Sequence, residues 1–126
     1  MYTRLYKKIF AVDSAILSMA KKRTVPQKIS PYVWGYLVAL ENTGVPITSA
    51  YVFGSWAKGK AHRWSDVDLC IVSPKFTSWS KTTKALAKAR TNDLLLIEPH
   101  GFHPKTFQPK NDPLAHEVVT HGIKVI

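Results

Sequence analysis

Residues 52–72 read VFGSWAKGKAHRWSDVDLCIV, and this stretch decides the fold. It contains parts of two short apolar runs, and a glycine–serine pair directly follows the first of them. Apolar runs of this length, bounded by glycine and small polar residues, are typical of strands. The stretch therefore predicts strands over residues 47–53 and 67–73. A turn at Gly54–Ser55 and a short helical turn through Ala61 are expected to join them.

Two motifs in this stretch suit the binding of a metal ion and of phosphate. Gly54 lets the backbone turn sharply and approach a ligand closely. Ser55 offers a hydroxyl and an N–H at the start of a helical turn, which is a natural phosphate site. Asp66 and Asp68 lie two positions apart on a strand, so their side chains leave the same face and repel each other without a cation. The pattern predicts an Mg²⁺ site that shares its ligands with substrate phosphates.

A third carboxylate on a neighbouring strand would complete the metal site, and Glu98 is the candidate. Glu98 follows the apolar run over residues 94–97, where a strand would deliver it to the rim of the sheet. Asp93 lies at the opposite end of that strand and is the weaker choice. The predicted catalytic and metal-binding residues are therefore Asp66, Asp68 and Glu98. The alternative is that the glycine–serine pair is only a turn and that the acids are solvated or cap a strand.

The segment between the two motifs carries the cations Lys58, Lys60 and Arg63. Cations there could neutralise a triphosphate, as they do in phosphoryl transfer. Lys58 and Lys60 are accordingly predicted to bind the nucleotide together with Gly54 and Ser55. A solvated basic loop is the alternative for each of these cations.

Other residues with chemical potential favour plainer roles. His100 and His103 could suggest zinc, but no cysteine pair accompanies them, so ordinary loop histidines are preferred. Cys70 lies in an apolar run and is predicted to be a buried small side chain. Trp56, Trp64 and Trp79 flank the motifs, and one of them could stack on a base or ribose, but packing in the core or at an interface is preferred.

Length and composition indicate one compact, soluble domain. The 126 residues include no apolar stretch long enough to cross a membrane. Eighteen Lys and Arg against eight Asp and Glu give a net charge of +10, which attracts phosphates, nucleic acid or an acidic partner. Lys81, Lys84 and Lys88 share one side of a predicted helix and form either a docking face or a solvated face. The lone Cys70 and the lack of a signal-peptide pattern predict a cytoplasmic protein.

Helices and strands alternate along the chain and predict an α/β (α+β) fold, with a mixed sheet of about four strands flanked by helices. Residues 1–30 are expected to form an N-terminal helical extension, and residues 31–126 the domain itself. The apolar stripe of the extension either packs on the domain or is an association surface. Besides the two strands above, the pattern predicts helices over residues 1–23, 31–44, 78–90 and 112–122, with Ser30 as the cap of the second, and strands over residues 94–97 and 123–126.

The sequences GSWAKG at residues 54–59 and SDVDL at residues 65–69 resemble the signature of the DNA polymerase β-like nucleotidyltransferase superfamily. Within it, the chain most resembles the minimal nucleotidyltransferases, the small partners in HEPN–MNT toxin–antitoxin pairs. The resemblance is specific over residues 47–73 and softer over residues 94–126. Residues 1–30 have no counterpart.

The resemblance implies the polymerase β-like nucleotidyltransferase fold, Mg²⁺, and transfer of a nucleoside monophosphate from an NTP to a hydroxyl acceptor. It places triphosphate contacts on Gly54 and Ser55 and metal ligands on Asp66 and Asp68, while Glu98 stands where the family often has Asp. It implies ATP as donor, AMP as the group moved and a HEPN-type protein as partner, and it leaves a homo-oligomer open. Two other functions stay open: an antitoxin that acts by contact through a weak or inactive nucleotide site, and a nucleic-acid-binding protein.

Overall fold

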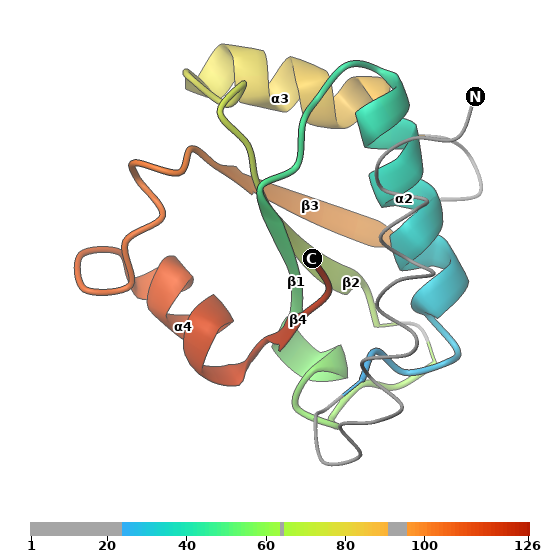
Figure 1. Ribbon diagram of the computed structural model, residues 1–126. Helices are drawn as coiled ribbons and strands as arrows, with labels where there is room; N and C mark the ends of the chain where they lie inside the picture. The colour runs from blue at the N-terminus through green and yellow to red at the C-terminus, as the bar shows by residue number, and fades with distance from the viewer. Residues whose placement is uncertain (1–23, 64, 91–95) are drawn as a thin grey trace.

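The computed structural model describes residues 24–63, 65–90 and 96–126 (Figure 1). The helix expected over residues 1–23, Trp64 and Asp93 lie outside the described residues. In chain order the elements are α2 (Ser30–Asn42), β1 (Ser49–Phe53), the 3₁₀ turn η1 (Gly54–Trp56), β2 (Val67–Val72), α3 (Trp79–Lys88), β3 (Ile97–Phe102), α4 (Pro113–His121) and β4 (Ile123–Lys124).

The four strands form one mixed sheet in the order β3-β2-β1-β4. Strand β1 runs antiparallel to both β2 and β4, whereas β2 and β3 are parallel. The parallel pair needs a crossover, and α3 lies within it. The predicted mixed sheet of about four strands flanked by helices is thus confirmed.

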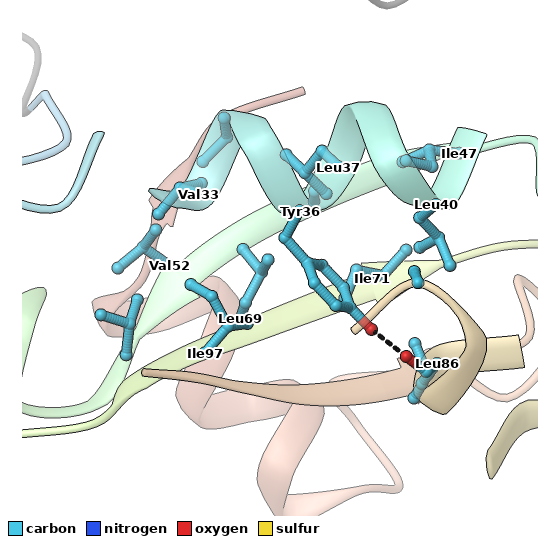
Figure 2. Close-up of a cluster of buried hydrophobic side chains, with 14 of the residues drawn as sticks. Val33, Tyr36, Leu37, Leu40, Ile47, Val52, Leu69, Ile71, Leu86 and Ile97 are labelled. Atoms are coloured by element: carbon cyan, nitrogen blue, oxygen red, sulfur yellow. Dashed lines mark hydrogen bonds between the residues drawn. The ribbon is translucent and has the colours of Figure 1, made fainter. Parts of the chain in front are cut away.

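Strand β2 contributes to two cores because its side chains alternate between the faces of the sheet. Leu69 and Ile71 belong to the larger core, which also contains residues of α2 and α3 (Figure 2). Cys70 and Val72 pack with Val118 of α4 in a smaller core. Figure 1 shows α2 and α4 on opposite sides of the sheet. Among the described residues, no helix is both long enough and apolar enough to cross a bilayer.

The predicted N-terminal cap is confirmed for α4 but not for α2. Asp112 caps α4 as expected, since its carboxylate accepts from the N–H groups of Leu114 and Ala115. The prediction that Ser30 caps α2 is wrong, because Ser30 is already helical and Ile29 occupies the cap position without a side-chain hydrogen bond. The backbone N–H groups of Ile29 and Ser30 both donate to the Pro26 carbonyl, so a preceding turn already satisfies them.

Residues 94 and 95 of the strand expected over residues 94–97 lie outside the described residues, Leu96 is in a turn, and β3 begins at Ile97. Residues 99–101 read PHG, which is typical of a loop. Pro99 is tolerated because β3 is an edge strand of the sheet. Gly101 is required by packing: a Cβ there would lie 2.5 Å from Thr82 Cγ2 and 2.9 Å from Phe76 Cδ2. The local sequence signal and the tertiary environment therefore disagree over this segment.

Tyr36 joins α2 to α3 through a buried hydrogen bond. Its hydroxyl donates to the Leu86 carbonyl over 2.7 Å, and the side chain is fully buried (Figure 2). Burial raises the pKa of Tyr36 well above its ordinary value, although Arg90 opposes the shift, so the hydroxyl keeps its proton at neutral pH.

Tyr36→Phe is expected to lower the free energy of unfolding by about 1–3 kcal/mol, because the Leu86 carbonyl loses its buried donor. Urea denaturation measures this change. Tyr32→Phe on the same helix is the control, since Tyr32 is 41% exposed and should cost nothing measurable. Equal stability of the two variants would contradict a structural role for the Tyr36 hydroxyl.

Candidate functional site

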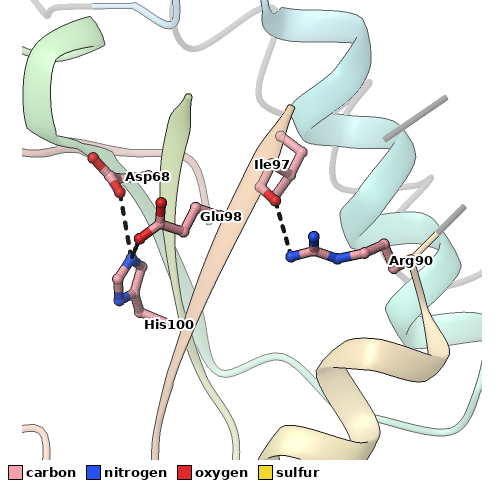
Figure 3. A network of polar contacts seen from close by, with 5 residues as sticks. All are labelled: Asp68, Arg90, Ile97, Glu98 and His100. Carbon is pink, nitrogen blue, oxygen red and sulfur yellow. Dashed lines mark hydrogen bonds and ion pairs between the residues drawn. The ribbon is translucent and has the colours of Figure 1, made fainter. Parts of the chain in front are cut away.

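Two carboxylates lie side by side where β2 and β3 begin. The parallel register pairs Asp68 with Glu98, and two residues further on it pairs Cys70 with His100. Alternation along each strand directs Asp68, Glu98 and His100 to one face of the sheet (Figure 3). It is the face that α4 covers, because Cys70 packs with Val118 of that helix.

His100 reaches both carboxylates with one ring nitrogen. Its Nε2 lies 3.3 Å from Asp68 Oδ1 and 3.4 Å from Glu98 Oε1 (Figure 3). The imidazole also packs edge-on against the Phe53 ring, with the two centroids 5.1 Å apart. One ligand atom from each of Asp68, Glu98 and His100 lies within 4.8 Å of the others, and we call these residues the Asp68–Glu98–His100 cluster. The cluster is accessible, since more than a quarter of each side chain is exposed.

Gly54, from the glycine–serine pair, packs directly against the Asp68 side chain. Gly54 has φ +73°, a conformation that residues with a Cβ rarely adopt. A Cβ at Gly54 would meet Asp68 Oδ2 at 2.2 Å, which is closer than atoms can approach. Phe53, the residue before it, is the cross-strand partner of Asp68. The two halves of the motif are therefore in contact, and the glycine is required by the carboxylate as well as by the turn.

The segment between the motifs is more turn than helix. Among the described residues of this segment only η1 is helical, and it is a single 3₁₀ turn, so the expected helical turn through Ala61 is too long. The turn is braced by backbone hydrogen bonds, including one from the Lys60 N–H to the Ser55 carbonyl over 2.9 Å. Trp56 Nε1 donates to the Ser65 carbonyl over 3.0 Å, and the ring packs against the larger core. The preferred packing role of Trp56 is thus confirmed.

Asp66 does not join the Asp68–Glu98–His100 cluster. It lies just before β2 and is exposed, and Val67 between the two aspartates is fully buried. The structure therefore brings together Asp68 and Glu98, two of the three predicted acids, and adds His100 in place of Asp66.

Lys58 forms an ion pair with α4. Its Nζ lies 2.7 Å from Glu117 Oε2, and about a third or more of each side chain is exposed. The hydrogen bond from Lys58 lowers the pKa of the Glu117 carboxyl, although desolvation opposes the shift. Lys60, the other predicted nucleotide-binding cation, is exposed on the turn that follows.

The interpretation of His100 as a loop histidine is wrong, because it lies in β3. The spacing of Glu98 and His100 already places two potential ligands on one face of a strand. That signal was missed because the strand was expected to end before Glu98. His103 does lie in a loop, where its Nδ1 accepts from the Lys105 N–H.

Arg90 fixes the start of β3 from outside the sheet. Its Nη2 donates to the Ile97 carbonyl over 3.1 Å (Figure 3). Ile97 directly precedes Glu98, so this contact helps to hold the carboxylate opposite Asp68.

Cys70 lies on the same face of the sheet as the Asp68–Glu98–His100 cluster. It is fully buried, and burial is the main cause that raises its pKa to about 12. Its predicted role as a small buried side chain is confirmed.

A hollow of about 510 Å³ lies at the other end of β3. Its lining includes Phe102 and His103 from β3 and the following loop, and Trp79 and Thr82 from α3. None of the predicted site residues lines it. Trp79 is 83% exposed, so it does not pack in the core, and its alternative packing role at an interface stays a prediction.

Comparisons with known proteins were made on the sequence and on the structure. The sequence matches the family model of the nucleotidyltransferase domain over residues 37–122. No curated protein sequence matches the chain significantly. A solved structure of a toxin–antitoxin with AMP-PNP shares 21% identity at a TM-score of 0.52, with 72% of this chain and 70% of that chain covered. A mutant of the toxin–antitoxin MntA-HpeT shares 19% identity at a TM-score of 0.50, with 71% and 69% covered.

Proposed function

The chain belongs to the nucleotidyltransferase domain family, and from that premise we propose that it moves AMP from ATP to a hydroxyl group on a partner protein. The observation that carries the proposal is the contact between the two motifs, with Gly54 folded over Asp68 and Glu98 beside it. A phosphate-binding turn and paired carboxylates are the parts that nucleotidyl transfer requires.

The donor atoms of the site fit a divalent cation. Asp68 and Glu98 present oxygens close together on one face, and Gly54 leaves room for Asp68 that any Cβ would fill. Asp68 and Glu98, together with Asp66 at the start of β2, are the residues that would hold Mg²⁺. When bound, Mg²⁺ would supply charge neutralisation of the triphosphate and of the developing negative charge.

The residues of the chain divide the remaining work. The backbone N–H groups and hydroxyl of Gly54–Ser55 hold the β- and γ-phosphates, and Lys58 and Lys60 neutralise them. Glu98 orients the acceptor hydroxyl and accepts its proton. The acceptor oxygen then forms a bond to the α-phosphorus while the bond from that phosphorus to the bridging oxygen breaks, and pyrophosphate leaves.

A HEPN-type toxin is the proposed acceptor and partner. The two structural neighbours are toxin–antitoxin proteins, and one of them was solved with AMP-PNP. Their likeness shows the fold, and the partner is inferred from the sequence resemblance above. We further propose that residues 31–126 form the transferase domain of a cytoplasmic protein. Residues 1–30 are then an extension that supplies an association surface, either for that partner or for a second copy.

The experiment that tests the function follows the label of ATP. The chain is incubated with Mg²⁺, the product of the adjacent gene, and ATP labelled at either the α- or the γ-phosphate. Transfer of AMP predicts that the α-label becomes attached to the partner and that the γ-label does not. Attachment of the γ-label would instead indicate a kinase, and attachment of neither would contradict transfer to this partner.

Nucleic-acid binding is the second candidate, and α3 favours it. Lys81, Lys84 and Lys88 are all exposed on one side of this helix. A basic helix face of this kind attracts the phosphates of nucleic acid. Nucleic-acid binding without nucleotide, with affinity that falls steeply as salt rises, would support this candidate.

Glu117→Gln is expected to tighten ATP binding by about two- to fivefold, as for the release of one exposed ion pair. Lys58 lowers the pKa of Glu117, so the carboxylate is ionised at neutral pH and competes with phosphate for the lysine. The pair persists above the ordinary pKa of Glu117 and is lost as the pH falls through the lowered one.

Calorimetry at neutral pH measures the affinity, and Lys58→Met is the matched variant, for which binding should weaken. If both variants bind ATP as the unmodified protein does, Lys58 has no part in nucleotide binding.

A further inference from the structure

His100 is the one member of the Asp68–Glu98–His100 cluster that the proposed transferase mechanism leaves without a task. Two contacts restrict the His100 side chain: its backbone belongs to β3, and the Phe53 ring packs against the imidazole. The Nε2 atom points toward the two carboxylates, and 28% of the His100 side chain is exposed to solvent. The position of this nitrogen is therefore built into the fold.

The distances within the cluster are long for an ion pair and also suit a set of metal ligands. Charge-assisted hydrogen bonds between a cationic nitrogen and a carboxylate are typically about 2.7–2.9 Å long. His100 Nε2 is instead 3.3 and 3.4 Å from the two carboxylate oxygens. Atoms that share a metal ion at about 2.1 Å lie roughly 3–4 Å apart, which agrees with these separations. His100 Nε2 thus contacts both carboxylates directly, and the same separations would let one ion contact all three ligand atoms.

We infer that His100 is a direct metal ligand and makes the site prefer Mn²⁺ to Mg²⁺. Mg²⁺ takes oxygen ligands almost exclusively, whereas imidazole nitrogen suits first-row transition ions. Mn²⁺ accepts both, so it suits two carboxylates, one imidazole and the oxygens of a triphosphate. The inference rests on the metal site of the proposed function but concerns which ion occupies it.

The test measures metal binding to the full chain, prepared without a histidine tag. Mn²⁺ bound to the protein should show the magnetic coupling of a directly coordinated ¹⁴N nucleus in pulsed electron paramagnetic resonance. His100→Asn should abolish that coupling and weaken Mn²⁺ binding by about tenfold or more, as for loss of a ligand or its support. Mg²⁺ affinity should change by less than about twofold. His103→Asn, in the loop beyond β3, should leave all three quantities unchanged.

Absence of the ¹⁴N coupling in the unmodified protein would overturn the inference, and this measurement needs no variant to fold. Equal weakening of Mn²⁺ and Mg²⁺ in His100→Asn would also overturn it. His100→Gln provides a second variant if the asparagine protein is unstable. Nitrogen-coordinated Mn²⁺ without transfer of the α-label would contradict the proposed function alone, whereas transfer with Mn²⁺ but no ¹⁴N coupling would contradict the inference alone.

Discussion

Asp68→Asn is expected to reduce nucleotidyl transfer by at least about a hundredfold, comparable to the loss of one strong electrostatic contact to the transition state. Asparagine has the shape of aspartate, so it fits beneath Gly54, against which the Asp68 side chain packs closely. The substitution also removes one of two neighbouring negative charges, since Asp68 is paired with Glu98 across the strands. The melting temperature should therefore stay the same or rise slightly.

Asp112→Ala is the matched control, because Asp112 is a carboxylate whose task is to cap α4. Its loss should lower stability by about 0.5–2 kcal/mol and leave the transfer rate of the folded protein unchanged. Rate and melting temperature are measured on the same preparations. An Asp68→Asn protein that is destabilised but fully active would end the catalytic assignment.

Gly54→Ala is expected to impair both folding and catalysis. Alanine at φ +73° is strained by about 1–3 kcal/mol. In addition, its Cβ would lie 2.2 Å from Asp68 Oδ2, so either the turn or the carboxylate must move. Transfer should fall by at least about a hundredfold, because a displacement of about 1 Å at a reacting group can cost that much.

Gly44→Ala is the control that separates the effect of backbone strain from the effect of the clash between the Cβ and Asp68. Gly44 has φ +94° at the end of α2, and a Cβ there would meet nothing within 4 Å. Its alanine variant should lose stability through backbone strain alone and keep its transfer rate. Denaturant titration and the α-label assay measure the two effects. Equal rates for the two alanine variants would show that the contact between Gly54 and Asp68 has no catalytic consequence.

The sequence predicted the parts of the site whose signals are local. Gly54 needs a positive φ, and Asp68 opens an apolar run, so a turn and a strand could be inferred from neighbouring residues alone. The position of Glu98 beside Asp68 was inferred in outline, but β3 was placed too early along the chain. Pro99 and Gly101 are unfavourable in most strands and are accommodated only because of where β3 lies.

The features that sequence analysis missed depend on contacts between distant segments. His100 comes close to Asp68 through the pairing of β3 with β2, which no local pattern encodes, although its spacing from Glu98 already placed both side chains on one face of a strand. Lys58 is held by Glu117, almost sixty residues later, and the packing of α4 decides that contact. Whether Asp66 acts together with Asp68 stays a prediction, because Asp66 lies outside the cluster.

The outer rim of β3 determines how a partner can attach. The Val67 N–H donates to the Leu96 carbonyl, and the Ser73 N–H donates to the Phe102 carbonyl. The backbone N–H and C=O groups of even-numbered residues of β3 therefore point toward β2, and those of odd-numbered residues point away from the sheet. Pro99 then faces outward without a donor, and the outward carbonyl of Ile97 is already taken by Arg90. At the opposite border of the described sheet, β4 is only two residues long. Neither border is a good template for an added strand, so recognition through this sheet must use side chains and helices, and strand-to-strand aggregation is discouraged.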